Sequence, residues 1–408
     1  MKRKRFLLPL GVLAVLLAAG AWTLHDASRT VDISLPEELR SRTAGGLERV
    51  EQAGHYPALL FRAMLAWGQL PDPIPVTSGA YLYRVEYWTP GIDGALTLAS
   101  GLLAVPTANT FRGTVSYHHG TNSSRHDAPS APSLGEGVLG AALLAGGGYV
   151  FLAPDYIGLG SSDAAHPYLH AGLTSSTVID FMRAARSYVK HARGTWPARL
   201  YLTGFSQGGH ATAVVQRDLE ALADPEFHVA AAAPIAGAYD LADVSFPYAL
   251  ANRQSLYLAY LSNAYATVYK HPLNSILTEE FATRVPVLFD GEHDVEAILA
   301  ALPGDPRDLF NAAFLADYDA QKPTWFTSAM RENQAFDWIP KAPIRAYHGE
   351  NDLDVNPEES RSLVKRFQER GAQAEFISVG PYAHNESVFY AIGKVRAWFD
   401  ELSAPALQ

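Results

Sequence analysis

The sequence of 408 residues contains no cysteine. This absence excludes disulfide bonds, thiolate metal sites, a cysteine nucleophile and a lipid anchor attached to cysteine. A chain of this length can bury enough apolar surface to be stable without cross-links. We therefore expect the fold to be held by its core alone.

Positive charge is also scarce, with 32 Lys and Arg against 42 Asp and Glu, for a formal net charge of −10. A nucleic-acid-binding face needs clustered basic side chains, and the one basic cluster lies at the extreme N-terminus, Lys2 to Arg5. We therefore expect no nucleic-acid partner.

That basic cluster is followed by an apolar run from Phe6 to Ala21, which ends in small residues, as a signal-peptidase site requires. The pattern predicts a signal peptide over residues 1–21 and a secreted or periplasmic protein. Because the run is only slightly shorter than a bilayer span, an uncleaved N-terminal membrane anchor is the alternative interpretation.

Residues 22–75 show helix-like apolar spacing between Leu47 and Leu70, then a proline-rich break at 71–75. We interpret them as a helical lead-in packed on the outside of a larger domain. That domain is predicted to comprise residues 76–243 and 342–408.

Strand-like and helix-like patterns alternate through the predicted core. Strands are predicted at 81–85, 96–105, 114–117, 149–153, 199–203, 229–235, 344–347 and 374–379, and helices at 175–192, 207–222, 358–370 and 387–402. This alternation predicts an α/β fold with a mostly parallel central sheet flanked by helices.

Residues 244–341 interrupt the alternation with a stretch rich in Tyr, Phe, Leu and Ala that lacks strand periodicity. We predict a helical insertion. Placed between two sheet strands, it would cover the carboxyl ends of the strands as a cap or lid, where open α/β sheets bind ligands. The alternative is a packing domain remote from the chemistry.

The sequence Gly204-Phe205-Ser206-Gln207-Gly208 matches the G-x-S-x-G pattern of a nucleophilic serine. The pattern alone is weak, but here it follows a predicted strand and precedes a predicted helix, which is the setting that the motif requires. Glycines on both sides allow the sharp turn that exposes the serine hydroxyl. We predict Ser206 as the nucleophile.

A serine nucleophile needs an imidazole base, and the imidazole needs a carboxylate. His384 follows the last predicted strand, where the base belongs. Glu350, Asp352 and Asp354 compete for the acid, and the H-G-x-x-D spacing from His348 favours Asp352. For His348 itself we expect a structural hydrogen bond.

Two backbone N–H groups should stabilise the oxyanion, one from Gln207 beside the nucleophile and one from the glycine-containing loop after strand 114–117. We assign the second to Thr121. His118 and His119 in this loop have no third ligand at a suitable spacing, so we expect neither a metal nor a cofactor.

Several segments together resemble the secretory lipase family, which includes the fungal lipase A type and bacterial esterases. The segments are 117–121, 154–161, 166–168 and 204–209. The resemblance spans about residues 81–398 and implies an α/β-hydrolase fold, a helical lid, a Ser-Asp-His triad and a substrate pocket bordered by Gly120, Asp155 and Tyr156. One departure is the oxyanion loop, where fungal members carry an acidic side chain and this chain has His-Gly-Thr.

The predicted function is hydrolysis of carboxylic esters, as a lipase or esterase, through an acyl-enzyme. The substrate would be a small-molecule or lipid ester, with transient contact to a lipid interface. The alternatives are a serine peptidase related to prolyl oligopeptidases and a non-catalytic binding protein of the same fold. The region before residue 80 leaves no room for the β-propeller of the peptidases.

Overall fold

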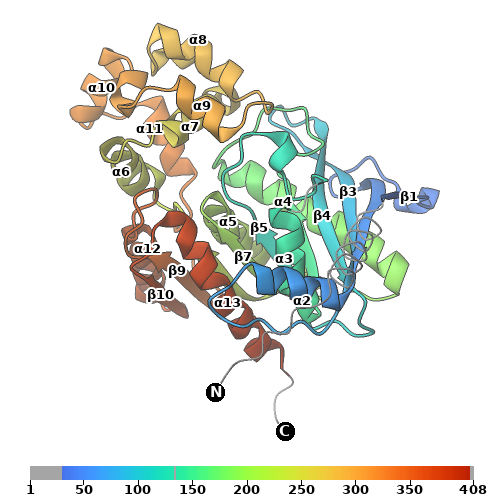
Figure 1. The fold of residues 1–408 in the computed structure, drawn as a ribbon. Coiled ribbons are helices and arrows are strands. Elements are labelled where there is room, and N and C mark those ends of the chain that lie inside the picture. Colours follow the sequence, from blue (N-terminus) through green and yellow to red (C-terminus); the bar gives the residue numbers. More distant parts are fainter. Residues whose placement is uncertain (1–29, 133–134, 405–408) are drawn as a thin grey trace, which may run out of the picture.

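The computed structural model describes residues 30–132 and 135–404 (Figure 1). The predicted signal peptide, 1–21, lies outside these residues. Within them, no helix combines the length and apolar character needed to cross a membrane.

A ten-stranded sheet forms the centre, in the order β1-β2-β3-β4-β6-β5-β7-β8-β9-β10. The strands are β1 (Val31–Ile33), β2 (Leu47–Tyr56), β3 (Ala80–Pro90), β4 (Leu96–Pro106), β5 (Thr114–His118), β6 (Val150–Pro154), β7 (Arg199–Phe205), β8 (His228–Ile235), β9 (Ile344–Gly349) and β10 (Ala374–Gly380). Strands β5 to β10 pair in parallel, and β1 to β4 extend the sheet antiparallel from β6. The predicted α/β class with a mostly parallel sheet is confirmed.

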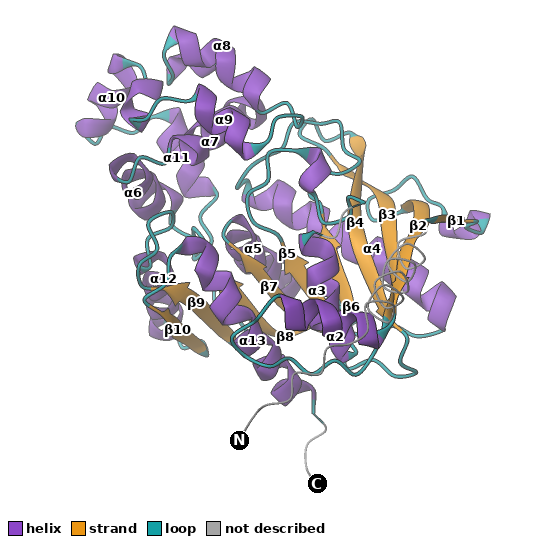
Figure 2. Ribbon diagram, viewed as in Figure 1, coloured by secondary structure: helices purple, strands orange, loops and turns teal. Residues whose placement is uncertain are grey.

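Helices cover both faces of this sheet, as Figure 2 shows. One apolar cluster joins the sheet to α4 (Ala171–Arg193), α5 (Gln207–Leu222) and α12 (Glu358–Glu369). A second cluster, on the other face, joins it to α2 (Ala58–Trp67), α3 (Glu136–Leu144) and α13 (His384–Ser403). The central strands β5 to β8 are buried along most of their length, which is why their sequences are rich in apolar residues.

The predicted helical lead-in is wrong over its first half. Residues 47–56 form strand β2, and only α2 is helical. The pairing of β2 with β3 shifts register between Leu47 and Arg49 and again between Gln52 and Gly54. Such bulges break the two-residue alternation of a strand, so buried Leu47 and Val50 fall three residues apart, as on a helix.

The chain between β8 and β9 forms helices with their own apolar cluster, and we call this insertion the cap. Its elements are η4 (Leu241–Ser245), α6 (Phe246–Ala251), α7 (Ser255–Tyr269), η5 (Leu273–Ser275), α8 (Glu279–Leu288), α9 (Val295–Ala301), η6 (Pro306–Leu309), α10 (Ala312–Asp319) and α11 (Trp325–Glu332). In Figure 1 the cap, yellow to orange, lies above one end of the sheet.

Two segments join the cap to the core, and we call them its stems. Each stem is hydrogen-bonded to a glutamate side chain of the core. At the first stem, buried Glu359 of α12 accepts hydrogen bonds from the backbone N–H groups of Tyr239 (2.9 Å) and Asp240 (2.7 Å). At the second stem, Glu220 of α5 accepts from the N–H groups of Lys341 (2.7 Å) and Ala342 (2.9 Å). These bonds satisfy backbone donors where the chain leaves and rejoins the core.

Candidate active site

The sharp turn between β7 and α5 carries Ser206. Its backbone has φ 58° and ψ −118°, a strained conformation for a residue with a side chain. The flanking glycines are sterically required: a Cβ on Gly204 would lie 2.3 Å from the carbonyl oxygen of Gly208, and one on Gly208 would lie 1.9 Å from that of His118. The turn directs Ser206 away from the strand toward the start of α13.

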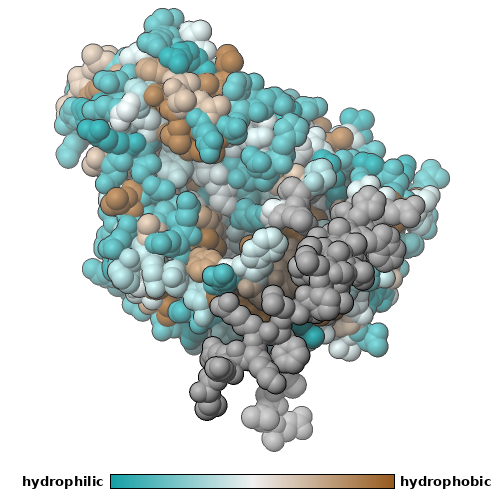
Figure 3. Space-filling view, in the orientation of Figure 1, coloured by the Kyte–Doolittle hydropathy of each residue, from teal (hydrophilic) through white to brown (hydrophobic). Residues whose placement is uncertain are grey.

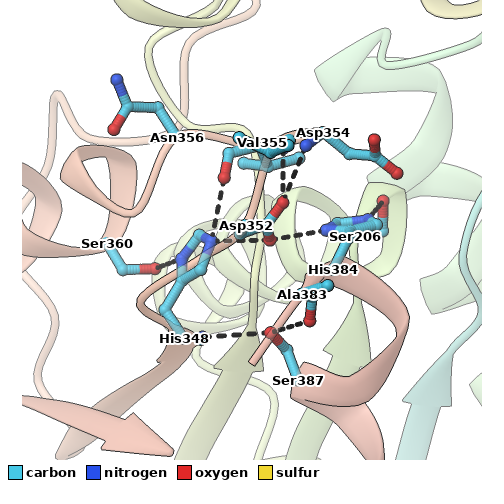
Figure 4. Close-up of polar contacts among 12 residues, drawn as sticks. Ser206, His348, Asp352, Asp354, Val355, Asn356, Ser360, Ala383, His384 and Ser387 are labelled. Atoms are coloured by element: carbon cyan, nitrogen blue, oxygen red, sulfur yellow. Dashed lines mark hydrogen bonds and ion pairs between the residues drawn. The ribbon is translucent and has the colours of Figure 1, made fainter. Parts of the chain in front are cut away.

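The structure brings Ser206, His384 and Asp352 together (Figure 4). The hydroxyl of Ser206 lies 2.8 Å from Nε2 of His384, and Nδ1 of His384 lies 2.7 Å from Oδ2 of Asp352. The three side chains come from the turn after β7, the first residue of α13 and the loop after β9. They are 6%, 5% and 1% exposed, so the network is largely shielded from water.

The carboxylate of Asp352 is fully occupied by hydrogen bonds. Its Oδ1 accepts from the backbone N–H groups of Asp354 and Val355, both at 2.9 Å, and its Oδ2 accepts from His384 and from Nε2 of His348 (3.0 Å). Burial by itself would raise the pKa of Asp352, but the bonds from the two histidines outweigh burial and hold the pKa below its usual value. Asp352 is therefore ionised at neutral pH.

The two competing carboxylates lie elsewhere. Asp354 faces the cap, where it accepts from Nε2 of Gln254 (2.8 Å) and the hydroxyl of Tyr257 (3.2 Å). Glu350 is paired with the guanidinium of Arg361. Neither contacts His384 within the described residues.

His348 makes the structural hydrogen bond expected from the sequence, and its partner is Asp352. Nε2 of His348 faces two acceptors, Oδ2 of Asp352 and the carbonyl oxygen of Val355 (3.2 Å), so this nitrogen carries the proton. Nδ1 lies 2.7 Å from the hydroxyl of Ser360. The four-residue spacing of His348 and Asp352 was visible in the sequence, but a contact between them was not predicted.

Gln207, predicted to supply one oxyanion donor, is the first residue of α5, where backbone N–H groups have no partner in the helix. Its side chain is fixed by His166, whose Nε2 lies 2.8 Å from Nε2 of Gln207. Burial lowers the pKa of His166 to about 4, so the ring is neutral. Because Nδ1 of His166 donates to the carbonyl of Ile157, its Nε2 accepts from the amide of Gln207.

Thr121, predicted to supply the second donor, borders the same cavity as Ser206, together with Gly120. Its hydroxyl lies 2.8 Å from that of Tyr168, which fixes the loop after β5. Across residues 30–132 and 135–404, the backbone N–H groups of Gln207 and Thr121 have no protein acceptor. Both are thus available to a substrate oxygen.

The prediction that Asp155 and Tyr156 border the pocket is wrong, because neither lines a cavity at Ser206. Asp155 is fully buried and accepts from the hydroxyl of Ser100 (2.6 Å) and the backbone N–H of Ser130 (2.9 Å). Tyr156 donates to the carbonyl oxygen of His119 (3.3 Å). Tyr156 thus contacts the loop after β5, as does the backbone carbonyl oxygen of Asp155, which lies 3.2 Å from Nε2 of His119. Whether a loop side chain faces the cavity or a neighbouring loop depends on how the loops pack and not on local sequence.

The side chain of His118 is hydrogen-bonded within the core and does not form a metal site with His119. It lies between the hydroxyls of Ser116 (3.1 Å) and Thr212 (2.8 Å), and burial lowers its pKa to about 3. In the part of the chain that the structure describes, no group of His, Asp and Glu side chains is arranged to hold a metal ion.

Two cavities meet at Ser206. The larger, of about 440 Å³, runs between α3 and α13, and its lining includes His384 and the oxyanion loop. The smaller, of about 50 Å³, lies under the cap, and its lining includes Gln207 but not His384. An ester bound at Ser206 would have one component on each side.

Tyrosines of the cap contact the loops that carry the site. The hydroxyl of Tyr248 donates to the carbonyl oxygen of Asp352 (2.8 Å), and that of Tyr260 donates to the carbonyl oxygen of Asn122 (3.1 Å). These residues were missed at the sequence level, although the tyrosine content of residues 248–269 was the signal that could have found them.

Comparisons with known proteins agree with this geometry. The model of the secretory lipase family matches residues 135–404. A solved structure from Legionella pneumophila has a TM-score of 0.82 at 27% sequence identity, covering 89% of this chain and 99% of that one. The rice cell wall degrading esterase LipA from Xanthomonas oryzae has a TM-score of 0.76 at 26% identity, covering 88% and 97%.

A more distant structure is that of Candida antarctica lipase A in its closed state, with a TM-score of 0.66 at 14% identity, covering 91% of this chain and 86% of that one. This last likeness concerns the fold alone. No curated protein sequence matches the chain significantly. The comparisons confirm the predicted α/β-hydrolase fold.

Proposed function

The chain belongs to the secretory lipase family, and from that premise we propose that it is an exported serine hydrolase that cleaves carboxylic esters through an acyl-enzyme. Ser206 is the nucleophile, His384 the general base and acid, and Asp352 the carboxylate that orients His384. The backbone N–H groups of Gln207 and Thr121 form the oxyanion hole. No cofactor takes part.

The observation that carries this proposal is the continuous chain of short contacts from the Ser206 hydroxyl through His384 to Asp352, at 2.8 and 2.7 Å. Both distances are within the hydrogen-bond range that proton transfer requires. The ionised Asp352 fixes the tautomer with the proton on Nδ1, which leaves Nε2 free to accept the proton of Ser206.

In the acylation step, Oγ of Ser206 attacks the ester carbonyl carbon while its proton passes to Nε2 of His384. The carbonyl oxygen takes up the negative charge and accepts hydrogen bonds from the two N–H groups. The bond from the carbon to the alcohol oxygen then breaks, and His384 gives its proton to that oxygen. Water repeats the sequence on the acyl-enzyme and releases the acid.

The test compares Ser206→Ala with the control Ser175→Ala. Ser175 is a buried serine of α4 that lines neither cavity. We expect the first variant to lose roughly three or more powers of ten in turnover of a p-nitrophenyl ester and to lose labelling by a fluorophosphonate. The second should retain both. Full turnover by Ser206→Ala would refute the nucleophile.

The same assay separates the rival functions. A serine peptidase would be labelled but would cleave peptide amides in preference to esters. A non-catalytic binding protein would give neither labelling nor turnover.

Export is tested by the N-terminus of the mature protein. We expect the protein in the medium or periplasm to begin at Trp22, after a signal peptide of residues 1–21. A membrane-bound protein that retains Lys2 to Arg5 would instead support the anchor.

Transient contact with a lipid interface is also part of the proposal, with the insertion predicted at residues 244–341 as the lid. Figure 3 shows hydrophobic surface over α8 and α9, where Val287 and Leu299 are 61% and 50% exposed. Activity that rises when the substrate forms an emulsion would support a lipase, and unchanged activity an esterase.

A further inference from the structure

The two cavities at Ser206 differ in more than volume. The larger one is lined mainly by apolar side chains, because α3 and α13 face each other across it, although Asn122, Glu136 and Asn385 also line it. The apolar lining residues on these helices are Leu139, Leu143 and Leu144 of α3 and Val388, Phe389 and Ile392 of α13. With about 440 Å³ it falls within the range of ordinary small-molecule sites. The pocket under the cap holds about 50 Å³, on the order of four water-sized groups.

The position of His384 decides which ester component enters which cavity. His384 must give its proton to the departing alcohol oxygen, so the alcohol has to lie on the side of the nucleophile that His384 faces. His384 lines the larger cavity and does not line the pocket under the cap. The acyl group, on the other side of the carbonyl carbon, is then directed under the cap.

Several side chains that line the pocket under the cap also pack in the apolar core of the cap. Leu258 and Leu261 of α7 line it and are only 2% and 5% exposed. Phe246 of α6, also in the wall, makes edge-to-face contacts with Phe310 and Phe326, at centroid distances of 5.6 and 5.8 Å. A longer acyl chain would have to displace these side chains, and overfilling a packed core is destabilising.

We propose that the pocket under the cap is the acyl site and that it restricts the acid to short chains, acetyl to butyryl, while the cavity between α3 and α13 takes a larger apolar or aromatic alcohol. This rests on the proposed function and names its substrate class. The enzyme is then a short-acyl esterase whose selectivity for the acid is set by the cap.

The first test varies one ester component at a time in the wild-type protein. With p-nitrophenol as the fixed alcohol, we expect kcat/KM to fall by about tenfold or more between butyrate and octanoate. With acetate as the fixed acid, kcat/KM should be maintained or rise from methyl to octyl alcohol. A preference for octanoate over butyrate would overturn the proposal.

The second test uses a matched pair of leucine truncations. Leu258→Ala enlarges the pocket under the cap and should move the acyl optimum toward hexanoate and octanoate. Leu143→Ala enlarges the other cavity and should leave the order of acyl chains unchanged while altering the alcohol series. The reverse outcome, an acyl optimum moved by Leu143→Ala and not by Leu258→Ala, would show that the acid occupies the larger cavity.

Ala249→Leu keeps the test decisive if Leu258→Ala fails to fold. Ala249 of α6 lines the same pocket, so the added side chain should narrow the preference toward acetate. All rates are divided by the fraction of protein that reacts with a fluorophosphonate, so that only folded enzyme is compared. If the proposed function itself is wrong, the wild-type protein turns over no ester of either series or Ser206→Ala stays active; if only this inference is wrong, ester turnover depends on Ser206 but long acids are preferred.

Discussion

The carboxylate of Asp352 accepts hydrogen bonds from two imidazoles on one oxygen, Oδ2. In the proposed mechanism His384 passes protons, whereas His348 contacts Ser360 through its other nitrogen and has no contact with Ser206 among the described residues. His348 is therefore a positioning residue: it fixes the direction of the carboxylate that orients the base.

We expect His348→Asn to lower kcat/KM by about tenfold to a hundredfold with little change in KM, because a hydrogen bond to a charged group is worth roughly 1.5–3 kcal/mol. Steady-state kinetics with a p-nitrophenyl ester measures this.

The matched control is His210→Asn, which removes an equally buried imidazole whose Nε2 bonds to the carbonyl oxygen of Asn333 (2.7 Å) and not to the triad. It should cost stability without a comparable loss of rate. Equal losses of kcat/KM in the two variants would contradict a positioning role for His348.

For single residues, the sequence predicts best those positions that are set by the neighbouring residues in the chain. Ser206, Asp352 and His384 each follow a recognisable strand, and the order of the three is fixed by the fold. The roles of Asp155 and Tyr156 were not predictable in this way, because a side chain on a loop can face the cavity or the loop behind it. The contacts of Tyr248 and Tyr260 depend on the docking of the cap, which leaves no local pattern.

At the scale of elements, the strands and helices of the parallel part are predicted closely, because each is a continuous apolar run or a clear helical repeat. The predicted helix 207–222 coincides with α5. Two elements escape prediction for physical reasons. The bulges in β2 give its buried residues a helix-like spacing. Helix α3 is apolar on all sides and rich in glycine and alanine, so its sequence shows no amphipathic period.

We expect the position of the cap to depend on the hydrogen bonds at its two stems. The glutamates that accept these bonds differ in burial. Glu359 is fully buried and Glu220 only half-buried. We expect Glu359→Ala to raise hydrogen exchange about tenfold over residues 239–251, because the backbone N–H groups of Tyr239 and Asp240 and the hydroxyl of Ser245 lose their acceptor. Hydrogen exchange read by mass spectrometry measures this.

Glu220→Ala is the matched control for the other stem. Its effect should be smaller and confined to residues near 341–342. Unchanged exchange over 239–251 in Glu359→Ala would mean that the apolar cluster of the cap, and not the stem, fixes the position of the cap.

At the scale of the whole molecule, buried titratable groups set how stability depends on pH. Burial lowers the pKa of His118 to about 3 and those of His166 and His210 to about 4. Burial raises the pKa of Glu359 to about 8, against the opposing effect of its hydrogen bonds. In the unfolded chain, His and Glu titrate near pH values of about 6.5 and 4.3.

The pKa shifts of the three histidines and of Glu359 have opposite effects on how stability changes with pH. Between about pH 4.5 and 6.5 the unfolded chain binds protons at three histidines that stay neutral in the folded protein, while the folded protein holds one proton on Glu359 that the unfolded chain has lost. The difference is two protons in favour of the unfolded chain. The histidine contribution is present above about pH 6.5 and is lost on acidification, whereas the Glu359 contribution is present below about pH 4.3 and is lost as the pH rises through about 8.

We therefore expect the free energy of unfolding to be largest near pH 6.5 and to fall toward acid by roughly 3 kcal/mol per pH unit. It should fall toward pH 8 by roughly 1 kcal/mol per unit, from Glu359 alone. Urea denaturation at pH 5, 6.5 and 8 measures both slopes. Glu359→Gln should abolish the alkaline decline and steepen the acid one, because the opposing proton is gone. A stability that stays level from pH 6.5 to 5 would show that the three histidines become protonated without unfolding, and hence that water reaches them in the folded protein.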